Sequence, residues 1–163
     1  MPSGKINLPQ LNSGETGLAY PHTQLLDSVG SNSINKPYVF AIMPYLDEIE
    51  DVFFYGIQRP INAAGYLCER SDPIPETSRA LHRVLSRIET ASYVVAELST
   101  SSPDVYMELG YALGKQRPTF VLVQEGIKLP FIAQAYKCIT YQRIRDLEQS
   151  LAKEIQGVDG ILR

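Results

Sequence analysis

The sequence predicts a doubly wound, flavodoxin-like α/β fold, with a five-stranded parallel sheet and helices on both faces. From residue 37 onward, short apolar runs alternate with amphipathic segments. The runs show little polar alternation, which is typical of parallel strands that are buried on both faces. Right-handed crossovers between parallel strands then place helices on both sides of the sheet. The 163 residues are enough for one such domain with a substantial core.

Five apolar runs predict the strands of this sheet. They cover residues 38–43, 66–70, 93–98, 118–123 and 137–141. Pro44 ends the first run, because proline cannot donate a hydrogen bond to a neighbouring strand. The carboxyl ends of all five strands should meet at one edge of the sheet, where ligands bind in folds of this class.

Four helical segments alternate with the strands. The first begins at the acidic residues that follow Asp47, is expected to bend at Pro60 and stops at Gly65. The third begins where Ser102 and Pro103 resemble an N-cap followed by proline at the first helical position. The closing helix covers residues 143–156.

The second helix has an apolar stripe and a basic face. The inward residues of this helix are expected to be Leu81, Val84, Leu85 and Ile88. Arginines recur at four-residue spacing and predict a solvated face: Arg79, Arg83 and Arg87. In the third helix, Gly110 and Gly114 each reduce helix stability by about 1 kcal/mol relative to alanine, so we expect close helix-to-sheet packing there.

Residues 1–36 differ in composition from the rest of the chain. They are rich in Gly, Ser, Asn and Pro, as in a linker or arm, whereas residues 37–163 form the predicted α/β domain. An arm of this kind can lie on its own domain or on a second subunit, and the sequence leaves both options open.

Composition and charge exclude several classes of function. The net charge of -3 gives no basic excess, so we expect no nucleic-acid partner. No apolar run approaches the roughly 20 residues of a membrane span, and no signal-peptide core is evident, so we expect no membrane partner and a cytoplasmic location. Two isolated cysteines and two unrelated histidines predict reduced thiols and neither a metal site nor a cofactor.

The third helix carries the most informative residue, Glu108. At about 100° per residue, Val105, Leu109 and Ala112 form a buried stripe, and Glu108 lies at its edge. A carboxylate beside a core face must be paired, neutralised or directed into a cleft, and a cleft carboxylate is a candidate for chemistry.

Other polar residues follow the strands toward the same edge. The candidates are Met43 and Tyr45 after the first strand, Arg70 and Asp72 after the second, and Glu97, Ser99 and Asp104 around the third. A carboxylate at such an edge can stabilise an oxocarbenium-like transition state or attack an anomeric carbon, while a second carboxyl group protonates the leaving group. A cationic leaving group, such as nicotinamide in NAD, needs no acid.

Several of these segments together resemble the nucleoside 2-deoxyribosyltransferase-like proteins, which are relatives of TIR-type NAD-cleaving domains. The resemblance covers about residues 37–142, and its most specific part is Ser102 to Ala112. It implies a flavodoxin-like fold, a homo-oligomer, and cleavage or transfer of the N-glycosidic bond of a nucleoside or nucleotide. It also implies that Glu108 is the nucleophile. The chain departs from the family at Ser92, where relatives often carry aspartate.

The sequence leaves alternative roles open for these residues. Asp72 suits a helix cap as well as a catalytic acid, and Arg70 suits a structural ion pair as well as a ligand contact. Glu97, Ser99 and Asp104 are substrate-binding candidates, with Met43 and Tyr45. At the level of function, the alternatives are a TIR-like NAD glycohydrolase of bacterial immunity and a non-catalytic module that binds a nucleotide-derived signal.

Overall fold

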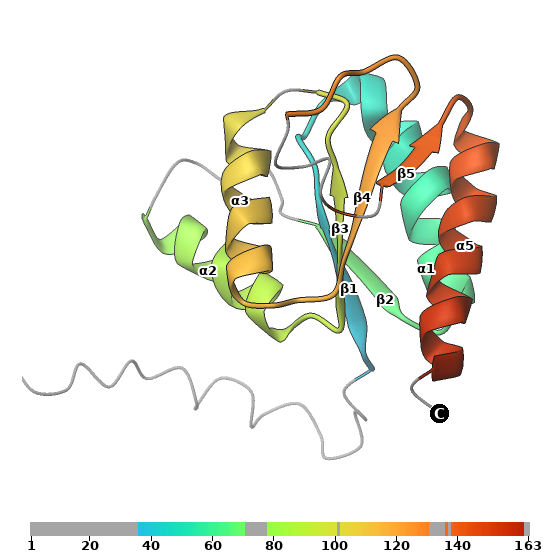
Figure 1. The fold of residues 1–163 in the computed structure, drawn as a ribbon. Helices are drawn as coiled ribbons and strands as arrows, with labels where there is room; N and C mark the ends of the chain where they lie inside the picture. The colour runs from blue at the N-terminus through green and yellow to red at the C-terminus, as the bar shows by residue number, and fades with distance from the viewer. Residues whose placement is uncertain (1–35, 71–77, 101, 131–135, 137, 162–163) are drawn as a thin grey trace, which may run out of the picture. The chain divides into compact units, whose positions relative to one another are not determined.

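The computed structural model describes residues 36–70, 78–100, 102–130, 136 and 138–161. They contain one sheet of five parallel strands: β1 (Tyr38–Ile42), β2 (Leu67–Arg70), β3 (Tyr93–Glu97), β4 (Thr119–Gln124) and β5 (Cys138–Tyr141). The strand order is β2-β1-β3-β4-β5 (Figure 1). The predicted flavodoxin-like fold is therefore confirmed. The predicted arm, except for Lys36, lies outside the described residues.

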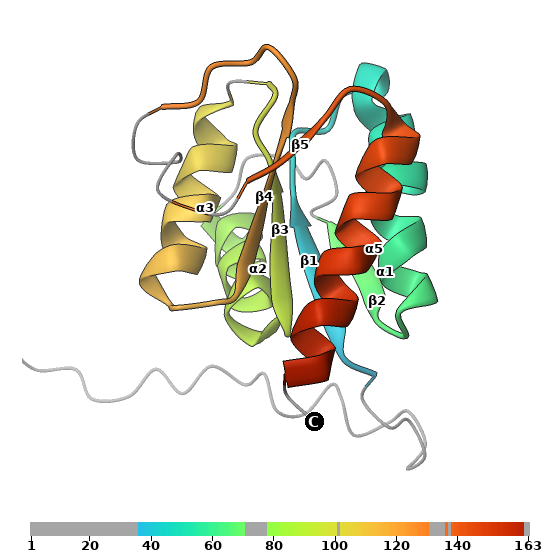
Figure 2. The ribbon, with the colours of Figure 1, turned by 45° about the vertical axis from the view of Figure 1, so that its right-hand side comes forward.

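Helices cover both faces of the sheet (Figures 1 and 2). One face is covered by α2 (Ser78–Thr90) and α3 (Pro103–Gly114), and the other by η2 (Val52–Gln58), α1 (Arg59–Ala63) and α5 (Ile144–Ile161). Successive residues of a strand point to opposite faces, so β1 contributes Val39 and Ala41 to one core and Phe40 and Ile42 to the other. Burial of all five residues of β3 follows from this double cover.

The first crossover changes its helical type at the predicted bend. A 3₁₀ turn, η1 (Asp47–Ile49), leads into the π-helical η2, which ends where α1 begins. Pro60 has no N–H, and in an α-helix its ring would clash with the carbonyl four residues earlier. The N–H of Arg59 instead bonds to the carbonyl of Phe54, five residues back. The wider turn therefore accommodates a proline that we expected only to bend the helix.

Close backbone packing occurs at Gly56, and the expectation for Gly110 and Gly114 is wrong. A Cβ atom added at Gly56 would lie 2.7 Å from Leu147 Cδ2 of α5. Nothing lies within 4 Å of a Cβ added at Gly110 or Gly114. Both of these glycines are on the outer side of α3, so their spacing does not report contact with the sheet.

Helix α2 differs from its prediction in two residues. Leu81 is 39% exposed, because α2 packs on the sheet mainly through its second half, where Ile88 is buried. The Arg87 side chain is 39% exposed, but it also contacts two neighbouring residues. Its guanidinium bonds to Glu69 of β2 and stacks on the Tyr38 ring, 3.9 Å from the ring centroid.

Both cysteines are free thiols. Cys68 and Cys138 are partly buried, and burial raises the pKa of the Cys68 thiol to about 12. At that pKa the Cys68 thiolate is almost absent at neutral pH, so this thiol is a poor nucleophile. Within the described ranges, no helix has both the length and the apolar character that crossing a membrane requires.

Candidate active site

The strand order fixes where a ligand site is expected. The chain leaves β1 toward the face that carries η2 and α1, and it leaves β3 toward the opposite face, which carries α3. Since β1 and β3 are neighbours, their carboxyl ends form the switch point of the sheet. In open α/β sheets, ligands bind outside the strand ends at this point.

Glu108 belongs to the β3 side of the switch point. As predicted, Val105, Leu109 and Ala112 are the buried stripe of α3, and the half-buried Glu108 lies at its edge. Burial, and to a smaller extent the negative charge of Asp104, raise the pKa of the Glu108 carboxyl to about 7. Near neutral pH, this carboxyl group is therefore divided between a proton-donating form and a nucleophilic form.

Asp104 itself lies in the first turn of α3 and is exposed. Its carboxylate meets the positive end of the helix dipole, which favours a negative charge without any catalytic role. Pro103 occupies the first turn as predicted, and Ser102 has the extended backbone of an N-cap, but its side chain makes no capping hydrogen bond. The start of α3 is therefore set by backbone geometry.

Arg70 is held by protein groups. Its side chain is 7% exposed, and Nη2 donates to both carboxylate oxygens of Glu50, at 2.6 and 2.9 Å. The guanidinium lies between two aromatic rings, 4.1 Å from the centroids of Tyr45 and Phe53. Nη2 thus makes the structural ion pair, which is one of the two roles left open, whereas the buried Nη1 has no hydrogen-bond partner. Stacking on the guanidinium holds Tyr45 beside the end of β1.

The two predicted residues after β1 have different environments. Met43 is 5% exposed and belongs to the core on the η2 side. Tyr45 is 47% exposed, although one face of its ring is covered by Arg70. Of the pair, Tyr45 is the residue that a ligand can reach in this conformation.

Glu97 is fully buried and accepts hydrogen bonds from its surroundings. The backbone N–H of Ser99 lies 3.2 Å from Oε2, and the Ser99 hydroxyl donates to Oε1. The Tyr141 hydroxyl, from the end of β5, donates to Oε1 at 2.9 Å. Ser99 Oγ in turn accepts the backbone N–H of Gln124 at 2.8 Å. The structure thus joins two predicted residues, Glu97 and Ser99, to each other.

Sequence reasoning missed two partners and named one residue that lies outside the described part of the chain. Glu50 and Tyr141 were not predicted, although Tyr141 ends a strand at the ligand edge and could have been found by that criterion. Asp72, the predicted catalytic acid, is not among the described residues.

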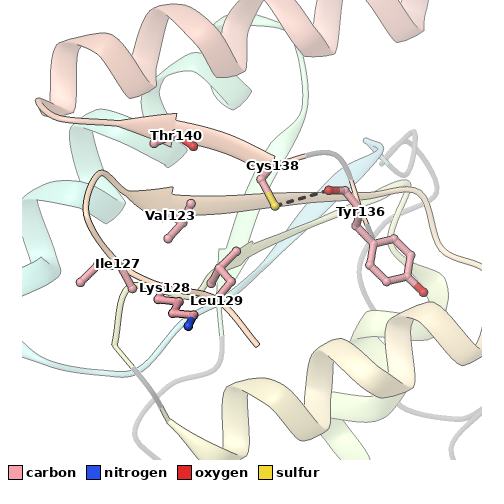
Figure 3. Close-up of a pocket in the computed structure, with 7 residues that line it drawn as sticks. All are labelled: Val123, Ile127, Lys128, Leu129, Tyr136, Cys138 and Thr140. Atoms are coloured by element: carbon pink, nitrogen blue, oxygen red, sulfur yellow. Dashed lines mark hydrogen bonds between the residues drawn. The ribbon is translucent and has the colours of Figure 1, made fainter. Parts of the chain in front are cut away.

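A separate open groove lies between β4, β5 and the loop that follows β4 (Figure 3). It has a volume of about 360 Å³, and none of the described residues that we predicted for the site lines it. The residues that line it are Val123, Ile127, Lys128, Leu129, Tyr136, Cys138 and Thr140.

Comparison with known proteins shows a shared fold. The sequence matches no protein-family model and no curated protein. Among solved structures, the CMP N-glycosidase BcmB of Clostridium botulinum is similar, with a TM-score of 0.58 and 15% identity over 70% of this chain and 97% of that chain. The 2-deoxyribosyltransferase of Bacillus psychrosaccharolyticus has a TM-score of 0.53 and 12% identity, over 68% and 90% of the respective chains. The chain therefore has the fold of nucleoside deoxyribosyltransferase-like proteins.

Proposed function

We propose that the protein cleaves or transfers the N-glycosidic bond of a nucleoside or nucleotide, with Glu108 as the nucleophile. The observation that carries the proposal is the half-buried Glu108 carboxyl beside the switch point, with a pKa of about 7. The fold likeness to a CMP N-glycosidase and a 2-deoxyribosyltransferase supports the same reaction class.

The reaction divides into two displacements at the anomeric carbon. The Glu108 carboxylate attacks this carbon as its bond to the base nitrogen breaks, and the electron pair of that bond stays with the base. The result is a glycosyl ester of Glu108. Water, or a second base in a transferase, then attacks the same carbon and releases the carboxylate. A neutral leaving base takes up a proton, whereas a cationic base such as nicotinamide leaves without one.

The raised pKa suits the first displacement. A carboxylate whose conjugate acid has a pKa near 7 is a stronger base, and hence a better nucleophile, than a solvated glutamate. It is also destabilised in the free enzyme, where burial and Asp104 disfavour its charge. Forming the neutral ester removes that charge and relieves the repulsion from Asp104.

The remaining site residues have supporting roles in this proposal. Tyr45 offers an exposed ring to the substrate, and the charge of Asp104 adds to the effect of burial in raising the pKa of Glu108. We assign proton donation to Asp72, which lies outside the described residues. We place the active site in residues 37–163, with residues 1–36 as an arm, and we expect a homo-oligomer, which light scattering can test.

The experiment is a mass-spectrometric screen for free base with deoxynucleosides, ribonucleosides, their 5′-monophosphates and NAD. The wild-type chain is compared with Glu108→Gln and with Glu148→Gln, a glutamate of α5 on the opposite face of the sheet. We expect base release by the wild type and by the control, and none by Glu108→Gln. An acid-quenched reaction should also yield a glycosylated peptide that contains Glu108.

The outcomes separate the three functions. Release of nicotinamide from NAD alone identifies the NAD glycohydrolase. Tight binding of a nucleotide without any turnover, unaffected by Glu108→Gln, identifies a binding module and refutes the proposal. Base release that persists in Glu108→Gln refutes the role of this residue.

A further inference from the structure

The carboxylate of Glu97 is the largest unexplained polar feature of the interior. It is the one charged residue among the described residues that is fully buried. Burial of a carboxylate is unfavourable unless hydrogen bonds replace its hydration, and a hydrophobic pair of similar shape is often no less stable. Its accessible surface of 0% means that it makes no contact with a ligand in this conformation. Glu97 can therefore act only through the groups that donate hydrogen bonds to it.

These groups belong to the carboxyl ends of three neighbouring strands. Glu97 is the last residue of β3, and the Tyr141 hydroxyl that bonds to it ends β5. Between them, the N–H of Gln124 at the end of β4 bonds to the Ser99 hydroxyl, which itself donates to Glu97. The backbone continues the link, because the N–H of Glu125 bonds to the carbonyl of Tyr141 at 2.8 Å. We refer to Glu97, Ser99 and Tyr141 as the carboxylate clamp.

The clamp fixes the beginning of the connection from β3 to α3. Ser99 is bound through both its N–H and its hydroxyl, so its backbone and side chain are fixed together. The N–H of Ser102, three residues after Ser99, bonds to the carbonyl of Thr100 at 2.7 Å. The N–H of Tyr106 then bonds to the carbonyl of Ser102 at 3.3 Å. These contacts lead directly into the helix that carries the nucleophile.

Glu97 is also close enough to the first turns of α3 to affect a titratable group there. Burial raises the pKa of the Tyr106 phenol, and the charge of Glu97 raises it further. Tyr106 is two residues before Glu108 on this helix. The Glu97 charge is thus felt at the helix that carries Glu108, although Glu97 projects on the η2 side of the sheet and α3 covers the other side.

We propose that Glu97 is a positioning residue, which acts through Ser99 and Tyr141 to hold the β3–α3 connection so that Glu108 faces the substrate. This inference rests on the proposed function and assigns Glu97 and Ser99 an indirect role. Since a misplacement of about 1 Å can reduce an enzyme rate by about 100-fold, loss of one clamp hydrogen bond should reduce kcat by roughly 10- to 100-fold. KM should change little, because the clamp does not contact the substrate.

The test uses single hydrogen-bond deletions in the full chain. Tyr141→Phe keeps the ring and removes one donor to Glu97, while Ser99→Ala removes another and Ser99→Thr restores a hydroxyl. Tyr38→Phe is the matched control: it deletes a tyrosine hydrogen bond, to the Arg87 carbonyl, at the opposite end of the sheet. Glu97→Gln is added only if it folds.

Two readouts are measured for each variant at temperatures where it is fully folded. The first is the kcat and KM of base release. The second is amide hydrogen exchange by NMR at Ser99, Gln124 and the first turn of α3, which needs no substrate. We expect Tyr141→Phe and Ser99→Ala to lower kcat at nearly constant KM and to speed exchange at these amides. Tyr38→Phe should do neither, and Ser99→Thr should recover activity relative to Ser99→Ala.

The outcomes distinguish failure of this inference from failure of the proposed function. If Tyr141→Phe and Ser99→Ala both keep the wild-type kcat, the positioning role of the clamp is refuted, while the proposed glycosidase function stands. If the wild type releases no base from any substrate, the proposed function fails, and hydrogen exchange alone decides the clamp. In that case, unchanged exchange at Ser99 and along α3 overturns it, and faster exchange confined to these amides supports it.

Discussion

Replacing the Glu108 carboxyl group with an amide should stabilise the protein at high pH. The pKa of this group is raised from its ordinary value of 4.5 to about 7. One pKa unit corresponds to about 1.4 kcal/mol, so full ionisation in the folded state costs on the order of 3 kcal/mol relative to a solvated glutamate. Glutamine is neutral at every pH, and Glu108→Gln removes this cost.

The sign of the pH dependence follows from proton linkage. Because the folded-state pKa is above the unfolded-state value, the folded state binds the proton more tightly between about pH 4.5 and pH 7. The wild type therefore loses stability as the pH rises through this window, and the loss levels off above pH 7. The advantage of Glu108→Gln should be larger at pH 8 than at pH 5 by about 2 kcal/mol. Solvent screening of the partly exposed carboxyl should reduce this to about 1–2 kcal/mol.

Urea denaturation at pH 5 and pH 8 measures the effect without any substrate. The free energies of unfolding of the wild type and of Glu108→Gln are compared at each pH, after two-state behaviour has been verified. Glu48→Gln, which makes the same change on an exposed residue of η1, is the control and should track the wild type. Stability curves for Glu108→Gln and the wild type that run parallel from pH 5 to pH 8 would refute the reasoning about burial of Glu108.

Further predictions concern the pH dependence of activity and two glycines. If Glu108 is the nucleophile, kcat/KM should rise with pH through about 7. Asp104→Asn should move this rise to lower pH, because it removes a charge that raises the pKa of Glu108. A profile of kcat/KM that instead falls through pH 7 assigns Glu108 to proton donation. Gly56→Ala should destabilise the protein by about 1–3 kcal/mol, because the new Cβ meets the buried Leu147, as thermal unfolding can show. Gly110→Ala has open space and should stabilise α3 by about 0.5–1 kcal/mol; destabilisation there contradicts the packing described for α3.

The sequence predicted the sheet because its signals are local. A buried parallel strand requires a continuous apolar run, and all five runs became strands within one residue of the expected ends. The stripe of α3 was predicted for the same reason, since helical periodicity alone placed Val105, Leu109 and Ala112 inward and Glu108 at their edge. Strand order was less local, but right-handed crossovers left few alternatives.

The side-chain partners were harder to predict because they depend on which element covers each face of the sheet. Arg70 ends β2 on the side covered by η2, so its partner, Glu50, comes from a segment whose 3₁₀ and π turns the sequence did not reveal. Arg87 likewise bonds to Glu69, which lies on the opposite side of the same strand. The four-residue spacing of the α2 arginines described a helix face correctly, but it carried no information about β2.

The burial of Glu97 was signalled by the alternation of residues along β3, but the usual exposure of charged residues at strand ends argued against it. A charged residue at a strand end is ordinarily exposed, yet Glu97 is in phase with Tyr93 and Val95, both of which face the η2-side core. Period-two alternation therefore predicts an inward carboxylate, and hence a need for donors from the neighbouring strand ends. Tyr141 meets that need from β5.

The carboxyl groups of Glu97, at the end of β3, and of Glu108, in α3, respond to burial in opposite ways. Glu97 is fully buried and accepts hydrogen bonds from Ser99 and Tyr141, which fix its place and keep it away from a ligand in this conformation. Glu108 is only half-buried, and burial raises its pKa, so that the uncharged form of the carboxyl group is favoured. A group that is destabilised in the free protein can gain stability when it reacts, whereas a fully buried group acts only through the neighbours that it holds in place. This difference is the physical reason for assigning chemistry to Glu108 and positioning to Glu97.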